Sequence, residues 1–551
     1  VSGEEIPVGI YVKPSDTSKV AGSFETLDPI LEAFENYFGP YQWERVGYVG
    51  TAIGAMEHST NIAYPHFCIT GNLSYESLFA HELSHQYFGD LITCASAEDM
   101  WLNEGWAVFC ESLYREAIYS PEAYHEDMFG RHKSVLQSAH ISDGDYYAVY
   151  GIPTEITYGT TVYQKGALVT HTMRHYMGDD LFFPAVQAYI EEYKFDYASS
   201  WDMRNFFSNH SGMDLTDFFD AWVFSPGFPE FSIDSVNVQT AGDSYEVTVY
   251  AKQKWKGPAG LANSNRVEVT FMDGQWNTET RLMEFSGETG SQTFTTNISP
   301  AVVMMDYHDK AADATTDLNL TITETGDLNL YDVFAKLHVS DLPGNDSVFV
   351  RLTHRWVPPD SLKQPVQGLI LSDYHHWRVD GIFPEGTDMA GSFMYNKYNN
   401  LDNTLMEDPN DSLVIMYRSS PAADWQSVDS EMMGSPFVGY YKVFDLQKGD
   451  YTLAVWDDEV VNVGELSGEE QGSLRVFPNP ANEMVTLETS FDGNFVIRVF
   501  DSSGRFVDKL AGKADHSPIR WHTGDLPKGT YLLKMEDEAG LQLATQKLLI
   551  N

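Results

Sequence analysis

Two histidines and a glutamate at close spacing are the residues of this chain that most directly suggest chemistry. Residues 81–85 read HELSH. On a helix, positions i and i+4 lie on one face, so the imidazoles of His81 and His85 can reach a single metal ion. Glu82 then projects beside the ion, where a carboxylate can take a proton from an attacking water. Because so short a pattern also arises by chance, it indicates a metallopeptidase only in combination with further residues.

A carboxylate that can complete the site follows downstream. Eighteen residues separate His85 from Glu104, which lies in the segment DMWLNEGWAVFCE at 99–111. Two histidines and one carboxylate, with water in the fourth position, form a catalytic zinc set. The neighbours of Glu104 favour a buried ligand over an exposed helix charge; they are Trp101, Leu102, Trp106 and Phe109. Glu111 falls on the same helical face, where it either orients a metal ligand or forms a surface salt bridge.

Together these residues resemble the aminopeptidase N family of gluzincin zinc metallopeptidases, whose pattern is HExxH, eighteen residues, then Glu within an NEG triplet. The triplet here is Asn103-Glu104-Gly105. Upstream, GAMEH at 54–58 resembles the family's GAMEN exopeptidase motif, with His58 in place of the usual asparagine. Downstream, Tyr158 and Tyr163 match a tyrosine pair with the same offset. The resemblance covers about residues 1–228 and implies a thermolysin-like, mainly helical catalytic domain that binds one Zn²⁺.

The resemblance also implies what the catalytic residues do. His81, His85 and Glu104 hold the zinc, and Glu82 is the general base that activates water and later returns the proton to the leaving amine. The hydroxyl of Tyr163 stabilises the tetrahedral oxyanion together with the metal. Tyr158 is the weaker catalytic candidate of the pair, and a place in the core or the cleft wall suits it better.

Recognition of the substrate is assigned by the same resemblance to the GAMEH segment. The carboxylate of Glu57 binds the free α-ammonium group of a peptide through a charge-assisted hydrogen bond. Backbone groups of Gly54, Ala55 and Met56 pair with the substrate strand. His58 leaves that glutamate intact but puts in doubt any hydrogen bond made by the family's asparagine.

The elements that must position these residues read as helices up to about residue 228. Apolar positions recur at helical spacing in 23–38, 74–90, 99–117, 163–177 and 202–221, and residues 44–53 read as a strand that leads into a loop. The opening residues IPVGIYVKP look like the last strand of something that precedes them. We therefore assign residues 1–12 to the remnant of an N-terminal β domain and residues 13–228 to the zinc peptidase domain.

Strands of alternating apolar and polar residues dominate after Pro226-Gly227-Phe228-Pro229. Residues 229–325 are predicted to form a β-sandwich, and 326–457 a second β-rich domain of unassigned role. The polar stretch 458–473 reads as a linker. The fold class is thus multidomain α+β, with a helical catalytic domain followed by β-sandwich domains. In 326–457 the aromatic residues suggest either carbohydrate contact or, preferably, a core; they are Trp356, Tyr374, Trp377, Tyr395 and Tyr398.

The last segment, 474–551, resembles the C-terminal sorting domain of type IX secretion substrates. The matching points are Pro478-Asn479-Pro480, Gly504-Arg505, Gly529-Thr530-Tyr531 and the final QKLLI. The resemblance implies passage through the outer membrane, followed by release or attachment at the cell surface, with the type IX secretion machinery as a partner. A generic β-sandwich binding module is the alternative for this segment.

Bulk composition excludes several classes of protein. The formal net charge of −46 argues against a nucleic-acid partner, because the phosphate backbone would be repelled. No run approaches the roughly 18 apolar residues of a membrane span, and no signal peptide is visible after Val1, although one can lie upstream. The three cysteines are too few for a disulfide framework, so buried free thiols are favoured; they are Cys68, Cys94 and Cys110.

Three other groups of polar residues also contain possible metal ligands. His171 and His175 have i, i+4 spacing without an intervening glutamate, and we expect them on a helix surface. The pair His375-His376 and the acidic stretch Asp306–Asp317 read as solvated loops, since no EF-hand pattern is present.

The predicted function is a secreted zinc aminopeptidase that removes N-terminal residues from peptides. The alternatives are a gluzincin endopeptidase or epoxide hydrolase, and a surface adhesion protein with a vestigial gluzincin fold.

Overall fold

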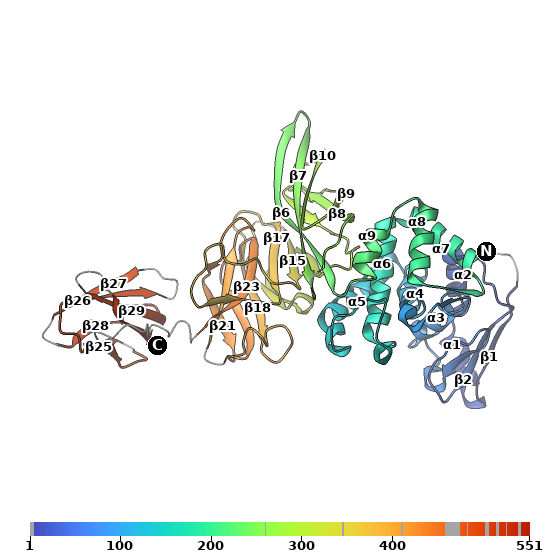
Figure 1. Cartoon of the computed structure of the whole chain (residues 1–551), viewed down its shortest axis with the longest axis horizontal. Coiled ribbons are helices and arrows are strands. Elements are labelled where there is room, and N and C mark those ends of the chain that lie inside the picture. The colour runs from blue at the N-terminus through green and yellow to red at the C-terminus, as the bar shows by residue number, and fades with distance from the viewer. Residues whose placement is uncertain are drawn as a thin grey trace.

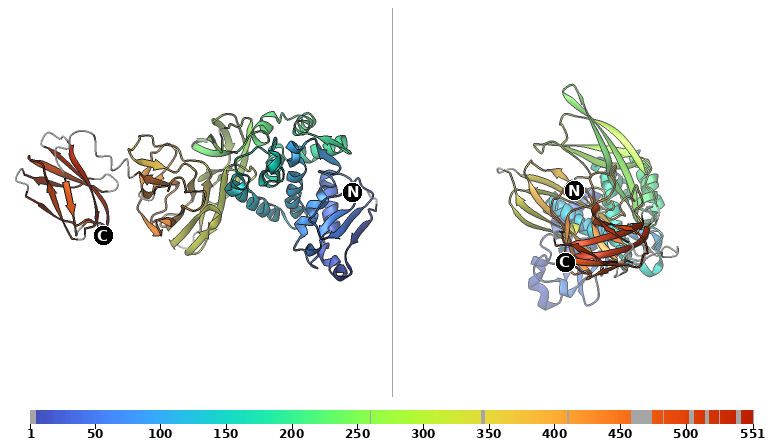
Figure 2. Two further views of the ribbon diagram at one scale, coloured as in Figure 1. Left: turned by 60° about the horizontal axis from the view of Figure 1, so that its bottom comes forward. Right: turned by 90° about the vertical axis from the view of Figure 1, so that its left-hand side faces the viewer.

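The structure, a computed structural model, places the helices before residue 223 and mainly strands after it. It describes residues 5–258, 260–343, 347–408, 411–457, 474–481, 483–501, 506–513, 517–524, 526–537 and 542–550. In Figure 1 the helical part, two β-rich parts and the C-terminal strands follow one another along the long axis of the molecule, and Figure 2 shows the same order from another side. The chain is therefore multidomain, with helices in its first part and β-sheets in the rest.

A small parallel sheet opens the helical part. It contains β1 (Val8–Tyr11), β2 (Val46–Thr51) and β3 (Ile62–Pro65), in that order. Val8 pairs with Val46 and Tyr48 with Ile62. Residues 8–11 thus share a sheet with the segments after them, which their assignment to a separate preceding domain did not anticipate. The expected strand within 44–53 is confirmed as β2.

The helices that follow are α1 (Val20–Ser23), α2 (Leu27–Phe38), α3 (Glu76–Ser84), α4 (Glu104–Ile118), α5 (Pro121–Ser142), α6 (Gly166–Met177), α7 (Asp179–Tyr193), α8 (Ser200–Ser211) and α9 (Thr216–Trp222). Each of the five helical segments expected from apolar spacing overlaps one or two of them. The short α1 lies almost entirely before the expected 23–38, and two longer helices, α5 and α7, were missed. In α5 the apolar residues are sparse among polar ones, and in α7 an internal proline, Pro184, weakens the helical signal.

Two three-stranded antiparallel sheets follow the helices. One has the order β10-β7-β6 and the other β11-β8-β9. Their bounds are β6 (Phe228–Ala241), β7 (Ser244–Lys256), β8 (Asn265–Met272), β9 (Thr278–Phe285), β10 (Thr289–Thr296) and β11 (Val302–Met305). Inward residues such as Val247 and Val249 of β7 alternate with more exposed ones, as expected for a sheet that is buried on one face.

The next β-rich part contains a seven-stranded sheet, β12-β15-β17-β23-β19-β20 with β16 on β23, and a five-stranded sheet, β13-β14-β18-β22-β21. The strands are β12 (Thr315–Ile322), β13 (Gly326–Leu330), β14 (Ala335–Asp341), β15 (Val348–Arg355), β16 (Leu369–Leu371), β17 (His376–Ile382), β18 (Asp388–Asn396), β19 (Ser412–Arg418), β20 (Gln426–Ser427), β21 (Ser430–Gly434), β22 (Val438–Val443) and β23 (Gly449–Trp456). Strand β12 pairs with β15 although it precedes the expected boundary at 326.

The C-terminal part has its own buried core between two sheets, β24-β25-β28 and β27-β26-β29-β30. Its strands are β24 (Leu474–Phe477), β25 (Met484–Thr489), β26 (Phe495–Asp501), β27 (Phe506–Gly512), β28 (Ile519–His522), β29 (Gly529–Asp537) and β30 (Gln542–Ile550). The Asn479 side chain of the PNP motif binds the backbone of β30 at Lys547 and Leu549. The predicted linker 458–473 and Gly504-Arg505 lie outside the described residues.

Several histidines expected at the surface are buried, which corrects those expectations. His171 contacts the Tyr124 hydroxyl at 2.6 Å and the Asp309 carbonyl at 3.2 Å, because the 306–313 segment packs over α5 and α6. His175 is partly buried beside it. His375 and His376 are also buried, at the start of β17.

The acidic stretch and the aromatic residues were also only partly anticipated. Asp306 and Asp313 are buried rather than solvated. The core role favoured for the aromatic residues is confirmed for Trp356, Trp377 and Tyr395, which are fully buried, whereas Tyr398 is exposed. All three cysteines are free thiols, two of them buried, as expected. Within the described part of the chain, no helix has the length and apolar character to cross a membrane.

Candidate metal centre and active site

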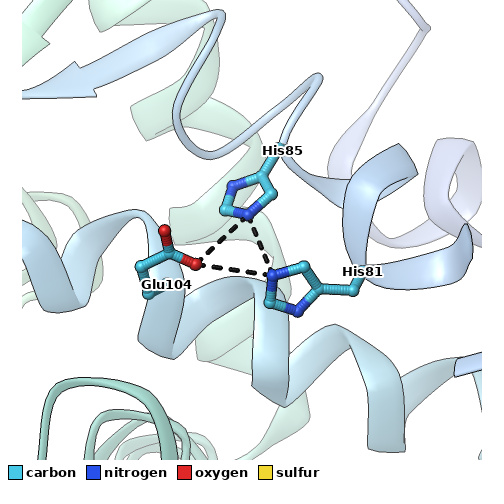
Figure 3. A group of neighbouring side chains, drawn as sticks. All are labelled: His81, His85 and Glu104. Carbon is cyan, nitrogen blue, oxygen red and sulfur yellow. Dashed lines mark hydrogen bonds and ion pairs between the residues drawn. The ribbon is translucent and has the colours of Figure 1, made fainter. Parts of the chain in front are cut away.

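Three side chains from two neighbouring helical segments meet at one point (Figure 3). Nε2 of His81 lies 3.1 Å from Nε2 of His85, and Oε2 of Glu104 lies 3.4 Å from each of these nitrogens. His81 belongs to α3, His85 caps its C-terminus, and Glu104 is the first residue of α4. All three side chains are buried, and among the described residues they are the one group of three or more with this potential to hold a metal.

The outer nitrogens of both rings have partners that fix how the rings are turned. Nδ1 of His85 lies 2.8 Å from the carbonyl of Phe88, and Nδ1 of His81 lies 2.8 Å from Oε1 of Glu111. Since a carbonyl and a carboxylate only accept, each Nδ1 donates, and each neutral ring directs the lone pair of its Nε2 at the shared point. With both rings neutral, three acceptor atoms face one another, so the site favours a cation there, either a metal ion or a proton on an imidazole. Glu111 thus orients the ring of His81, a candidate ligand, in line with one of its two expected roles.

The charges around the rings favour positive charge at the same point. Burial acts to lower the pKa of His81, but the carboxylates of Glu104 and Glu111 outweigh it and raise the pKa to about 10. Burial likewise acts to raise the pKa of Glu104, and the two imidazoles hold it well below its usual range. Glu104 is therefore ionised at neutral pH and available as an anionic ligand.

Glu82 lies beside this cluster without a partner for one of its oxygens. Its side chain is buried, and among the described residues no group hydrogen-bonds its Oε2. Burial is the main cause that raises the pKa of Glu82; the imidazoles of His81 and His85 oppose it and the charge of Glu57 adds to it, so that the pKa is about 7. A carboxyl group with this pKa changes protonation state near neutral pH, as a general acid–base group must.

Two glycines allow the helix that carries Glu104 to approach the Tyr163 segment. A Cβ atom on Gly105 would lie 2.8 Å from the Cα of Gly166, and one on Gly166 would lie 2.9 Å from the Cα of Gly105. Any side chain at either position would force α4 and α6 apart. The side chain of Asn103 also has a structural task, since its oxygen accepts a hydrogen bond from the Cys94 amide at 3.0 Å.

Tyr163 lies in a short π-helix, η5 (Thr161–Lys165), directly before α6. Its ring is half-buried, and burial together with the Glu104 carboxylate raises its pKa, so the phenol stays protonated. Asp143 accepts hydrogen bonds from the amides of Thr160 and Thr161 at the start of this turn. Tyr158, in contrast, is 71% exposed, which excludes the core and leaves the cleft wall of its two expected places.

The GAMEH segment lies next to the candidate ligands. The backbone of Met56 forms an antiparallel bridge with Ala63, through hydrogen bonds of 3.1 and 2.8 Å. Its amide is thus already engaged, which leaves Gly54 and Ala55 for the predicted backbone pairing with a substrate. Glu57 is half-buried, and its charge acts on Glu82 and His85. His58 is exposed.

Some residues that support the site were not predicted from the sequence. The amide of Gln86 donates to the Glu57 carbonyl at 2.8 Å and to Asp90 at 2.8 Å, while its oxygen accepts from the Thr60 amide at 3.0 Å. Gln86 therefore ties the Glu57 loop to the end of α3. Its position directly after His85 was the one available signal. Arg131, twenty residues beyond Glu111, had no signal at all.

Comparison with known proteins agrees with this geometry. Residues 23–222 match the family described as Peptidase family M1 domain. This segment is a peptidase family M1 domain, of the aminopeptidase N family. It contains all three candidate metal ligands together with Glu57, Glu82 and Tyr163, as the resemblance in the motifs predicted.

Relatives of the M1 domain carry aminopeptidase names. Probable aminopeptidase 1 of Sulfurisphaera tokodaii is 28% identical over 42% of this chain and 31% of its own length. Aminopeptidase N of Lactococcus lactis is 28% identical over 38% and 27%, and bovine glutamyl aminopeptidase 26% identical over 43% and 26%. The matches thus span less than a third of these relatives. A solved structure, Legionella pneumophila aminopeptidase A in complex with aspartic acid, aligns at TM-score 0.45 and 21% identity over 57% of this chain and 36% of that one.

The C-terminal part has an equally clear match. Residues 475–551 match the Secretion system C-terminal sorting domain. This confirms the resemblance to type IX secretion substrates that the PNP and GTY motifs indicated. The protein is therefore secreted, to the cell surface or the extracellular medium.

Proposed function

We propose that this chain is a zinc-dependent aminopeptidase, which removes N-terminal residues from peptides after its export by the type IX secretion machinery. The observation that carries the proposal is the convergence of His81, His85 and Glu104 with a partnerless carboxylate, Glu82, beside them. Because the chain spans less than a third of its named relatives, the activity is proposed for the M1 domain within it. We propose a thermolysin-like fold for that domain.

The donor set fits zinc in both chemistry and spacing. Zn²⁺ prefers imidazole nitrogen and carboxylate oxygen, and catalytic sites combine three such ligands with one open position. Ligand atoms held at about 2.0–2.1 Å in a tetrahedron lie about 3.3 Å from one another. The separations of 3.1 and 3.4 Å among the His81, His85 and Glu104 atoms agree with that geometry. M1 peptidases are a zinc-dependent family, which supports the same choice of metal.

The reaction that these residues support is hydrolysis of a peptide bond. When bound, zinc supplies Lewis-acid polarisation of the scissile carbonyl and makes water a better nucleophile. Glu82 accepts the proton of the attacking water and returns it to the leaving amine. The hydroxyl of Tyr163, protonated at neutral pH, donates a hydrogen bond to the oxyanion of the tetrahedral intermediate. The buried surroundings of Glu82 strengthen these interactions.

Exopeptidase specificity follows from the charge of Glu57. A half-buried carboxylate close to Glu82 can bind a free α-ammonium group and would so place the first peptide bond beside the residues that would hold the metal. An endopeptidase does not need a carboxylate that binds a free N-terminus. An adhesion protein does not need a complete set of metal ligands with a general base beside it. The half-buried position of Glu57, tied to α3 through Gln86, supports the aminopeptidase over both alternatives.

A pair of substrates tests the proposal. The secreted protein is expected to contain one zinc ion and to hydrolyse an aminoacyl chromogenic amide but not its N-acetylated form. Hydrolysis of both would indicate an endopeptidase or another hydrolase. A folded chain that contains zinc and cleaves neither would favour the vestigial adhesion protein.

A further inference from the structure

We propose that Arg131 is a positioning residue that couples the metal ligand His81 to the turn carrying Tyr163; this inference rests on the proposed function. Arg131 lies on α5, one of the helices that sequence patterns did not predict, and its side chain is only 14% exposed. It touches neither the three ligand atoms nor the proposed substrate-binding segment. Its importance lies in which residues its guanidinium joins.

The first branch of this connection leads to the metal ligand. Nη2 of Arg131 donates to Oε2 of Glu111 at 2.8 Å, and Oε1 of the same carboxylate lies 2.8 Å from Nδ1 of His81. Glu111 thus has one oxygen on the guanidinium and the other on the imidazole. The carboxylate cannot turn without breaking one of these bonds, so Arg131 sets the orientation in which the His81 ring is held.

The second branch leads to the proposed oxyanion residue. Nη1 of Arg131 donates to Oε1 of Gln164 at 2.9 Å, and Gln164 follows Tyr163 within η5. The third donor, Nε, binds Oδ2 of Asp127 at 2.8 Å, one turn earlier on α5. The guanidinium plane is therefore fixed by Asp127, and its two remaining arms reach Glu111 and Gln164.

Arginine suits this position for a geometric reason. Its five donors lie in one rigid plane, so two acceptors on different elements are held at a fixed distance from each other. A lysine ammonium is a single point of donation on a flexible chain and cannot fix both. A shift of Arg131 therefore displaces the His81 ring and the Tyr163 turn together, whereas loss of Gln164 releases only the turn.

The chain offers a matched control in Arg115. This residue also pairs with Asp127, at 3.4 Å, and donates to Ser77, but it contacts neither Glu111 nor Gln164. Arg131→Met and Arg131→Lys are compared with Arg115→Met in the full chain. Three quantities are measured: the zinc dissociation constant by competition with a chelator, kcat and KM on an aminoacyl substrate, and the thermal midpoint of the zinc-free protein.

We expect Arg131→Met to weaken zinc binding and lower kcat by roughly 10- to 100-fold each, the usual range for residues behind a ligand, with KM nearly unchanged. Arg131→Lys is expected to recover the thermal midpoint but not kcat. Gln164→Leu should lower kcat alone, and Glu111→Gln should mainly weaken zinc binding. In the double variant of Arg131→Met and Gln164→Leu, the losses in kcat should be smaller than the product of the single losses.

Other results would contradict either this inference or the proposed function. If Arg131→Met matches Arg115→Met in both zinc affinity and kcat, Arg131 is not a positioning residue. If Arg131→Met does not fold, Arg131→Lys and Gln164→Leu decide, and full activity in both overturns the coupling. A wild-type chain without zinc or hydrolysis contradicts the proposed function itself, whereas an active wild type with an indifferent Arg131 contradicts only this inference.

Discussion

The ring of Tyr163 lies parallel to the ring of the metal-ligand candidate His81, with 6.3 Å between their centroids and 3° between their planes. The Glu104 carboxylate also acts on the phenol, whose pKa it raises, so Tyr163 lies next to the cluster. The sequence suggested both Tyr158 and Tyr163 as catalytic candidates. In the structure Tyr163 is half-buried beside the cluster, whereas Tyr158 is exposed to solvent.

Tyr163→Phe is expected to reduce turnover more than substrate affinity. Removal of one oxyanion donor costs about 10²- to 10³-fold in kcat, because that hydrogen bond strengthens only as the negative charge develops. Steady-state kinetics measure the effect, with Tyr158→Phe as control in the same segment. A change in KM alone, or equal losses in the two variants, would count against the assigned role of Tyr163.

Glu82→Gln is expected to keep zinc and lose at least roughly 10²-fold in rate, the lower end of general-base effects. The amide is close in size to the carboxyl group but cannot take a proton from water. Zinc content and kcat are measured together, with Glu32→Gln, an exposed residue of α2, as control. Near-normal turnover with Glu82→Gln would refute the proposed mechanism.

Glu57→Gln is expected to lower kcat/KM for a substrate with a free amine by roughly 10- to 100-fold, the value of a charge-assisted hydrogen bond. The preference for the free amine over its N-acetylated form should shrink in the same variant. The measurement is the ratio of kcat/KM for the two substrates. An unchanged ratio would show that another group recognises the ammonium.

Acid should destabilise the contact between the helical part and the two β-rich parts that follow it. Lys256 of β7 donates to the Tyr374 hydroxyl at 2.9 Å, and since lysine has no acceptor, that hydroxyl donates in turn to Nε2 of His140 on α5, at 3.0 Å. Burial, and then the charge of Lys256, lower the pKa of His140 to about 4. The contact therefore contributes its full stability above about pH 6.5, the unfolded value, and loses it as pH falls towards 4.

The thermal midpoint measures this dependence. We expect it to fall from pH 6.5 to pH 4 in the wild type, and less steeply in His140→Gln, whose amide oxygen accepts the same hydrogen bond without titrating. His210→Gln, at an exposed histidine, serves as control. Equal slopes in the wild type and His140→Gln would show that His140 is not the group responsible.

Local patterns predicted the metal cluster because each motif lies on a regular element. The HELSH spacing requires only a helix, and Glu104 follows from the NEG triplet at the start of another, with Gly105 providing the close contact to Gly166. What the motifs did not contain was the partner of each outer nitrogen. The Phe88 carbonyl is backbone and carries no residue signature, and Glu111 fitted a ligand support and a surface salt bridge equally well.

Contacts between distant segments could not be predicted, because single-sequence patterns carry no information about them. Arg131 meets Glu111 and Gln164 only through the packing of α5, whose sparse apolar residues gave no helical signal. His171 seemed a surface residue because the 306–313 segment that covers it lies far away in the sequence. In the same way, β12 joins the sheet after the expected boundary, since its pairing partner β15 decides where it belongs.

Diffraction from crystals of the secreted protein, recorded on both sides of the zinc absorption edge, tests the metal centre most directly. We expect one anomalous peak, within about 2.0–2.2 Å of Nε2 of His81, Nε2 of His85 and a carboxylate oxygen of Glu104. The peak should disappear in His85→Ala. A well-folded protein with no peak between these atoms, or with its zinc bound elsewhere, would contradict the proposed metal centre.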